Sequence, residues 1–299
     1  MPLTRGWRPA LRIARREALR ARGRSILVLV MIGLPVLAIV ALDTLVRTAS
    51  VSTVEGLDRQ LGASDALVTY DGGTSPVDQY PDLSSRSSGD GGTLPAPTTA
   101  TVRSVLGPGT RLVDLVEGRV AVRTDLGLAR PTAFGLDLRD PAAAGLFHLE
   151  SGRLPRTEGE VVVSGRLAGR GFPVGSRLTL DAGPRLDVVG IAESTTIRGQ
   201  STLVGPVGPL TATALADPKI AQRAWLVDRP GGVSWPKVQA LNTQGMYALS
   251  RQVVENPPPA SEVTLPDYGG GRLGSDQLAV IGLVVAMALL EVEIGRAHV

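Results

Sequence analysis

The residues of this chain that could do chemistry are few and scattered. Ser234 and Lys237 have the S-x-x-K spacing of a nucleophilic serine and its lysine, but the K-T-G element of such enzymes is absent, because the only other lysine, Lys219, precedes Ile220. A serine at this place is also a common start of a helix. We therefore expect Ser234 to be a helix N-cap.

Three glycines fit a phosphate-binding pattern. Gly269, Gly271 and Gly274 have the spacing G-x-G-x-x-G, which binds a dinucleotide only when a strand precedes it and a helix follows. Leu265 to Tyr268 make a poor strand, so a flexible linker is the better interpretation. No G-x-x-x-x-G-K-[ST] loop occurs either, so the chain is not expected to hydrolyse ATP by that route.

Carboxylates and histidine give no stronger signal. Glu158 and Glu160 flank Gly159, a spacing that a general acid and base could use, but without a second signal we expect a solvated strand edge. His148 is the only histidine before residue 298, and there is no cysteine, so neither a metal site nor a disulfide is expected. We predict no catalytic, cofactor-binding or metal-binding residue and expect that the chain is not an enzyme.

An arginine-rich N-terminal stretch, which we call the basic head, is followed by a long apolar segment that determines where the rest of the chain lies. Residues 1–25 carry eight arginines and one glutamate, a net charge of +7, whereas the whole chain carries +3. Ile26 to Leu42 are 17 residues without a charge. Extended to Val46, the segment reaches about 31 Å as a helix, enough to cross a hydrocarbon core of about 30 Å. We predict a transmembrane helix at residues 26–46.

The arginines predict the orientation of that helix. Arginine on one flank favours a cytoplasmic location for that flank, so residues 47–275 are expected to be extracytoplasmic. Residues 8–24 also fit a basic amphipathic helix on the inner membrane surface. An arginine run is an alternative sign of nucleic-acid binding, but beside a spanning helix we expect no nucleic acid partner. The small residues Thr48 to Ser50 could be the cleavage site of a signal peptide, but we favour an uncleaved membrane anchor.

A second apolar segment approaches the end of the sequence. Leu278 to Leu290 would cover only about 20 Å as a helix, so residues 276–292 are predicted to be the start of a second transmembrane helix. Glu291 would need a partner or a cavity inside a membrane, or else it marks the membrane boundary. Residues 293–299 can be encoded by a DNA sequence that resembles the adapter of a sequencing library. We expect a non-native tail there and a longer natural protein.

Between the two apolar segments, short helices mix with short strands, which predicts an α+β domain. A hairpin turn is expected at Glu117 and Gly118, and residues 71–97, rich in Gly, Ser, Asp and Pro, are expected to be a mobile insertion. The expected helices are Val51 to Leu61, Thr98 to Leu106, Arg166 to Ala168 and Ser234 to Leu241. The expected strands are Ala66 to Tyr70, Arg111 to Val116, Arg119 to Arg123, Glu160 to Ser164, Arg177 to Leu180, Arg185 to Ile191 and Ala224 to Val227.

This arrangement resembles the first part of an FtsX-like or MacB-type ABC transporter permease. The resemblance lies in Gly152 to Pro155 (GRLP), Gly159 to Ser164 (GEVVVS) and the strands that follow, which look like the periplasmic core domain of that family. The closing Ala288 to Val292 is similar to the start of the second membrane helix in high-GC Gram-positive members. The insertion at residues 71–97 departs from the family pattern.

The resemblance implies a multi-pass plasma-membrane permease subunit. In that family a separate cytoplasmic ABC ATPase drives movement of the extracytoplasmic domain, for export or for handling of lipids, peptides or lipoproteins, and the permease forms a homodimer or a heterodimer. The alternative function is a membrane-anchored extracytoplasmic binding or adhesion protein without transport activity.

Overall fold

The computed structural model describes residues 23, 33, 53–88, 93–124, 127–181, 183–216 and 221–265. All of these from residue 53 onward belong to one compact unit, residues 52–269. Within these residues, ten strands form one mixed sheet with short helices against it, which confirms the predicted α+β class. The predicted membrane segments, the basic head and the tail lie outside the described residues, apart from the single positions 23 and 33.

The sheet is built from neighbours that are mostly antiparallel, with parallel pairs at β11–β9 and β12–β7. In spatial order its strands are β10 (Arg177–Thr179), β11 (Arg185–Ser194), β9 (Glu160–Val163), β12 (Thr202–Gly205), β7 (Thr132–Gly135), β4 (Arg111–Arg119), β13 (Gln222–Asp228), β1 (Ala66–Tyr70) and β14 (Tyr247–Ser250), while β8 (Phe147–Gly152) pairs with β11.

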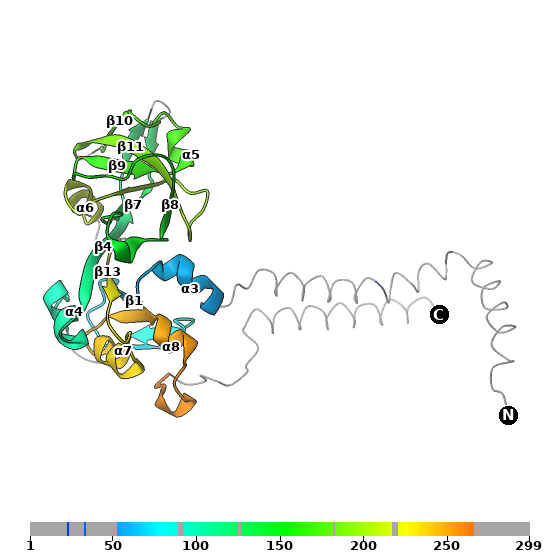
Figure 1. Ribbon diagram of the computed structural model, residues 1–299, viewed down its shortest axis with the longest axis vertical. Coiled ribbons are helices and arrows are strands. Elements are labelled where there is room, and N and C mark those ends of the chain that lie inside the picture. Colours follow the sequence, from blue (N-terminus) through cyan, green and yellow to red (C-terminus); the bar gives the residue numbers. More distant parts are fainter. Residues whose placement is uncertain are drawn as a thin grey trace, which may run out of the picture. The chain divides into compact units, whose positions relative to one another are not determined.

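The helices lie at different parts of this sheet (Figure 1), and two small hairpins accompany them. The helices are α3 (Thr53–Leu61), α4 (Thr99–Leu106), α5 (Gly165–Ala168), α6 (Pro209–Ala214), α7 (Trp235–Asn242) and α8 (Arg251–Glu255), with 3-10 turns η1 (Pro141–Ala143) and η2 (Ala260–Glu262). The hairpins are β2 (Val77–Gln79) with β3 (Arg86–Ser88), and β5 (Val122–Thr124) with β6 (Gly127–Ala129).

Two regions of the sheet have separate cores. We call β10, β11, β9, β12 and β8, with α5, the β10 end; its main cluster of buried side chains draws only on positions from Val120 to Ala214. We call β13, β1 and β14, with α4, α7 and α8, the β14 end. Its cluster joins positions 66–106 to positions 225–253. The β10 end is therefore a continuous stretch of chain inserted into a region built from both sides of that stretch.

Local sequence explains several elements. β11 alternates buried side chains with exposed or half-buried ones along its length, the period of a half-buried strand. Thr98 caps α4 through reciprocal hydrogen bonds with Thr101. Gly62 ends α3 at φ +56°, and a Cβ there would lie 2.3 Å from the Ala144 carbonyl oxygen, so only glycine fits. The predicted β1 and the helix starts at α4 and α7 are confirmed.

The predicted hairpin at Glu117 and Gly118 is wrong. β4 runs unbroken through both residues and pairs with β13 on one side and β7 on the other. A Cβ on Gly118 would lie 2.5 Å from the Ala214 carbonyl oxygen, so this glycine marks the close approach of the α6 segment rather than a turn.

The tract predicted to be a mobile insertion holds regular structure in its described residues, 71–88 and 93–97. The β2–β3 hairpin lies in it, and the buried side chain of Gln79 ties the hairpin to β14. Gln79 Nε2 donates to Ala248 O at 2.9 Å, and Ala248 N donates to Gln79 Oε1 at 2.8 Å. The side-chain amide thus pairs with the edge strand as a neighbouring strand would.

Candidate functional site

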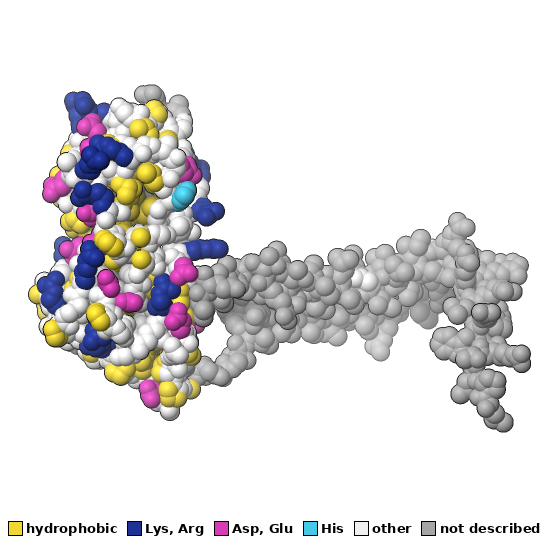
Figure 2. All heavy atoms as spheres, viewed as in Figure 1, with side chains coloured by type: hydrophobic (Ala, Val, Ile, Leu, Met, Phe, Trp, Pro, Cys, Tyr) yellow, Lys and Arg dark blue, Asp and Glu magenta, His cyan; other side chains and the backbone are white. Residues whose placement is uncertain are grey.

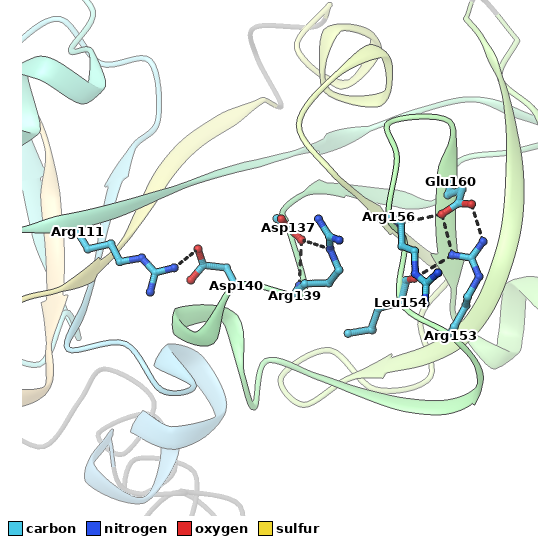
Figure 3. Close-up of polar contacts among 8 residues, drawn as sticks. All are labelled: Arg111, Asp137, Arg139, Asp140, Arg153, Leu154, Arg156 and Glu160. Carbon is cyan, nitrogen blue, oxygen red and sulfur yellow. Dashed lines mark hydrogen bonds and ion pairs between the residues drawn. The ribbon is translucent and has the colours of Figure 1, made fainter.

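The GRLP and GEVVVS block forms a structural clamp. Figure 3 shows Arg153 facing Glu160 at the start of β9, with hydrogen bonds of 2.8 Å (Nη1 to Oε2) and 2.5 Å (Nη2 to Oε1). The Arg156 backbone N–H donates to Glu160 Oε2 at 2.8 Å. Arg153, through its hydrogen bonds, and then the Arg156 N–H lower the pKa of Glu160 to about 2. Glu160 is therefore ionised at neutral pH and unsuited to donate a proton.

The predicted position on a strand edge is wrong for Glu160. β9 lies inside the sheet between β11 and β12, and the Glu160 side chain is only 18% exposed. Glu158 is exposed in the loop before the strand and lies against Gly208. The two carboxylates do not form an acid and base pair, because one of them is fully engaged by Arg153.

The structure also locates the other residues that the sequence offered as candidates for chemistry. Ser234 precedes the first residue of α7, as predicted, and Lys237 Nζ donates to the Leu106 carbonyl oxygen at the end of α4, at 2.6 Å. Lys237 therefore caps a neighbouring helix. His148 is exposed on β8. Figure 2 shows basic, acidic and hydrophobic side chains interspersed over the described surface on the side in view. Gly269, Gly271, Gly274 and Glu291 lie outside the described residues.

Glu117 was missed by sequence reasoning. Its side chain is partly buried on β4, and burial raises its pKa. Its strand neighbours in register are Phe134 and Gln222, so no cation on either adjoining strand faces it directly. Within the part of the chain that the structure describes, there is no group of three or more residues of the His, Cys, Asp and Glu types that could hold a metal ion.

A second cluster of contacts surrounds α3, and we call it the α3 junction. Arg251 Nη1 of α8 lies 2.7 Å from Asp58 Oδ1, and Arg251 Nη2 donates to Gly62 O at 3.0 Å. The hydroxyls of Thr195 and Thr196, directly after β11, donate to Arg59 O at 3.0 and 2.8 Å. One short helix is thereby bonded both to α8 of the β14 end and to the end of β11.

One contact connects the end of the η1 turn to the α3 segment, and an ion pair connects its start to β4. The Ala63 N–H donates to Ala144 O at 2.8 Å, and Arg111 Nη2, on the first residue of β4, lies 2.6 Å from Asp140 Oδ2 (Figure 3). Leu57 and Leu61 of α3 are buried with Leu249 and Val254. The α3 junction is therefore packed as well as hydrogen-bonded.

A groove of about 430 Å³ lies on the sheet face between the α4 N-terminus and α6, across β4 and β13. Asp114 and Val116 of β4 and Arg223 and Trp225 of β13 line it together with Val207, Leu215 and their neighbours. Its components come from two distant parts of the sequence. The β4–β13 register, which brings them together, was not predicted.

The comparisons with known proteins give weak likenesses. No protein-family model and no curated protein matches the chain. One similar solved structure is the extracellular domain of the ABC-type transporter YknZ from Gram-positive bacteria, with 14% identity, TM-score 0.34, and coverage of 48% of this chain and 77% of that one. Another is a domain described as belonging to a permease protein of Porphyromonas gingivalis, with 13% identity, TM-score 0.39, and coverage of 63% and 90%. Scores this low carry no inference about function.

The predicted membrane crossing is not represented in the described part. None of the helices among those residues combines the length and apolar character that a bilayer crossing requires. Apart from position 33, the segments for which a crossing is predicted, residues 26–46 and 276–292, fall outside this part.

Proposed function

We propose that residues 53–265 form the extracytoplasmic domain of an ABC transporter permease subunit of the FtsX or MacB type. A separate cytoplasmic ATPase would drive this domain through the membrane helices, for export or for handling of lipids, peptides or lipoproteins. The observation that carries the proposal is the α3 junction. The helix that follows the first predicted membrane segment is bonded to α8, which precedes the second, and also to the end of β11.

This connection would give the domain a mechanical role. A shift of α3 along its axis would act on Arg251 through Asp58 and on Thr195 and Thr196 through the Arg59 carbonyl. Because packed elements move as units rather than deform continuously, the shift would reach both ends of the sheet. Two of the sequence candidates, Glu160 and Lys237, are engaged in structural contacts, and in this proposal the work would come from the ATPase.

The first test is the position of the domain relative to the membrane. The chain has no cysteine, so single cysteines report without background. Ser87→Cys on β3 is exposed. It should react with a membrane-impermeant maleimide in intact cells, whereas Thr4→Cys in the basic head should react only after lysis. Labelling of both positions, or of Thr4→Cys alone, in intact cells would overturn the proposed topology.

The second test addresses the ATPase and distinguishes transport from anchored binding. The source locus should continue in frame beyond Val292 into further apolar segments and lie beside an ATPase gene. In the reconstituted pair of full-length proteins, Arg251→Gln, which removes the ion pair with Asp58, should lower the ATP hydrolysis that depends on the complex. Arg177→Gln, which removes an exposed ion pair at the β10 end, is the matched control and should leave it unchanged. A frame that ends after a few residues, with no ATPase gene nearby, would favour the anchored binding protein.

A further inference from the structure

The groove between α4 and α6 presents two opposite charges that do not neutralise each other. In the β4–β13 register Asp114 faces Trp225 and Val116 faces Arg223, so the four side chains occupy one face of the sheet. Asp114 and Arg223 are therefore diagonal neighbours, whose backbones stand about 7–8 Å apart. Among the described residues the two form no ion pair with each other, and the Arg223 guanidinium has no hydrogen bond or ion pair of its own.

Asp114 is held in place while part of it stays available. Trp225 Nε1 donates to Thr99 Oγ1 at 2.9 Å, and Thr99 Oγ1 donates to Asp114 Oδ1 at 2.9 Å. Trp225 is only 3% exposed, so this chain of hydrogen bonds starts from a fixed buried side chain. The second carboxylate oxygen, Oδ2, has no donor among the described residues and lies in an exposed side chain. The sheet surface in the groove thus presents an oriented acceptor, the Asp114 carboxylate, and a cation, the Arg223 guanidinium, at diagonal positions.

Apolar side chains complete the site. Val116 lies on the sheet surface directly opposite Arg223, and Leu215 and Val207 also line the groove. Val207 is 46% exposed, one of few large apolar side chains so exposed in the described part. A volume of about 430 Å³ lies within the usual range of small-molecule sites, roughly 300–1,000 Å³.

We infer that this groove binds a short peptide of two or three residues with free termini and apolar side chains. The α-ammonium would bind Asp114, and the α-carboxylate would bind Arg223. An extended residue spans about 3.3–3.6 Å, so two residues span about the 7–8 Å that separates the backbone positions of Asp114 and Arg223. A ligand with one charge would leave the other protein charge without a partner. This site does not depend on the proposed transport activity.

The test uses the full chain purified in detergent and the probe peptide Ala-Leu-Ala in titration calorimetry. The free peptide should bind, and its C-terminal amide and its N-acetyl derivative should each bind about tenfold more weakly or worse, because each lacks one charge-assisted contact. Arg223→Gln should lower affinity for the free peptide to that of the amide and abolish the effect of amidation. Asp114→Asn should do the same for acetylation.

Arg185→Gln is the matched control, because Arg185 is exposed on β11 and does not line the groove. It should leave all affinities unchanged. The inference is overturned by no binding of Ala-Leu-Ala at about 1 mM, by equal affinity for free and blocked peptides, or by a Arg223→Gln variant that still discriminates against the amide. Circular dichroism of each variant excludes loss of fold as the cause.

Discussion

At the β14 end buried hydrogen bonds join residues far apart in the sequence, whereas at the β10 end surface ion pairs join residues close together. Gln79 bonds Ala248, 169 positions away, and Asn242, 163 positions away. Arg153 and Glu160 are 7 positions apart, and Arg177 and Asp187 are 10 apart. The β14 end therefore needs the two outer parts of the domain to meet, while the β10 end is complete within one stretch of chain.

This difference predicts two units of local stability. Leu186 is fully buried in the core of the β10 end and Leu241 in that of the β14 end. Each change to alanine should cost about 3 kcal/mol in the free energy of unfolding. In hydrogen exchange, Leu186→Ala should lower protection mainly in β9 and β11, and Leu241→Ala mainly in β1 and β14. If both variants lower protection equally in all four strands, the two ends unfold as one unit and the comparison fails.

A smaller effect is expected from the polar contact at the edge of the sheet. Gln79→Ala would leave the Ala248 N–H and carbonyl without their Gln79 partner and would remove the Gln79 Oε1 acceptor of Asn242 Nδ2. We expect a loss of about 2 kcal/mol, because buried polar groups without partners are costly. Urea unfolding measured by tryptophan fluorescence would show it, since Trp225 and Trp235 both lie in the β14 end.

Ser87→Ala, on the exposed strand of the same hairpin, is the control for Gln79→Ala and should change the midpoint little. An unchanged midpoint for Gln79→Ala itself would mean that the hairpin contributes nothing to this end of the sheet.

The smallest expected effect is the pH dependence of the Arg153 clamp. The pKa of Glu160 falls from an ordinary 4.5 to about 2 in the folded chain, so the clamp stabilises the fold above about pH 4.5 and loses this contribution as the pH falls toward 2. Arg153→Gln should lower Tm slightly at pH 7, and the difference from wild type should shrink below pH 4.5. Arg177→Gln, which removes another exposed ion pair, is the comparison variant. A difference that grows at low pH would contradict the assignment.

Local signals in the sequence were sufficient for many single elements. The sequence predicted the helix at α3, the strands at β1 and β11, and the start of α7 after Ser234. These elements are specified by residues within a few positions, so the sequence shows them directly. The mixed α+β class followed from their alternation.

The predictions that were wrong concern residues whose roles depend on contacts with distant parts of the sequence. Gly118 looks like a turn residue until α6 is placed above β4, and Gln79 looks like a loop residue until β14 is placed beside it. The groove has the same origin, because Asp114 and Arg223 come together only through the β4–β13 register. The block around Arg153 and Glu160 was noticed as a family resemblance, but its clamp could not be inferred from the residue types alone.

The inserted position of the β10 end has a consequence for biosynthesis. As the chain emerges from its N-terminus, β1 and α4 appear first, then all strands of the β10 end, and only afterwards β13 and β14. The β10 end can assemble as soon as its own residues are available, since domains tend to fold in the order of synthesis. The sheet neighbours of β1 are β13 and β14. Both edges of β1 therefore stay unpaired until the last part of the domain has been synthesised.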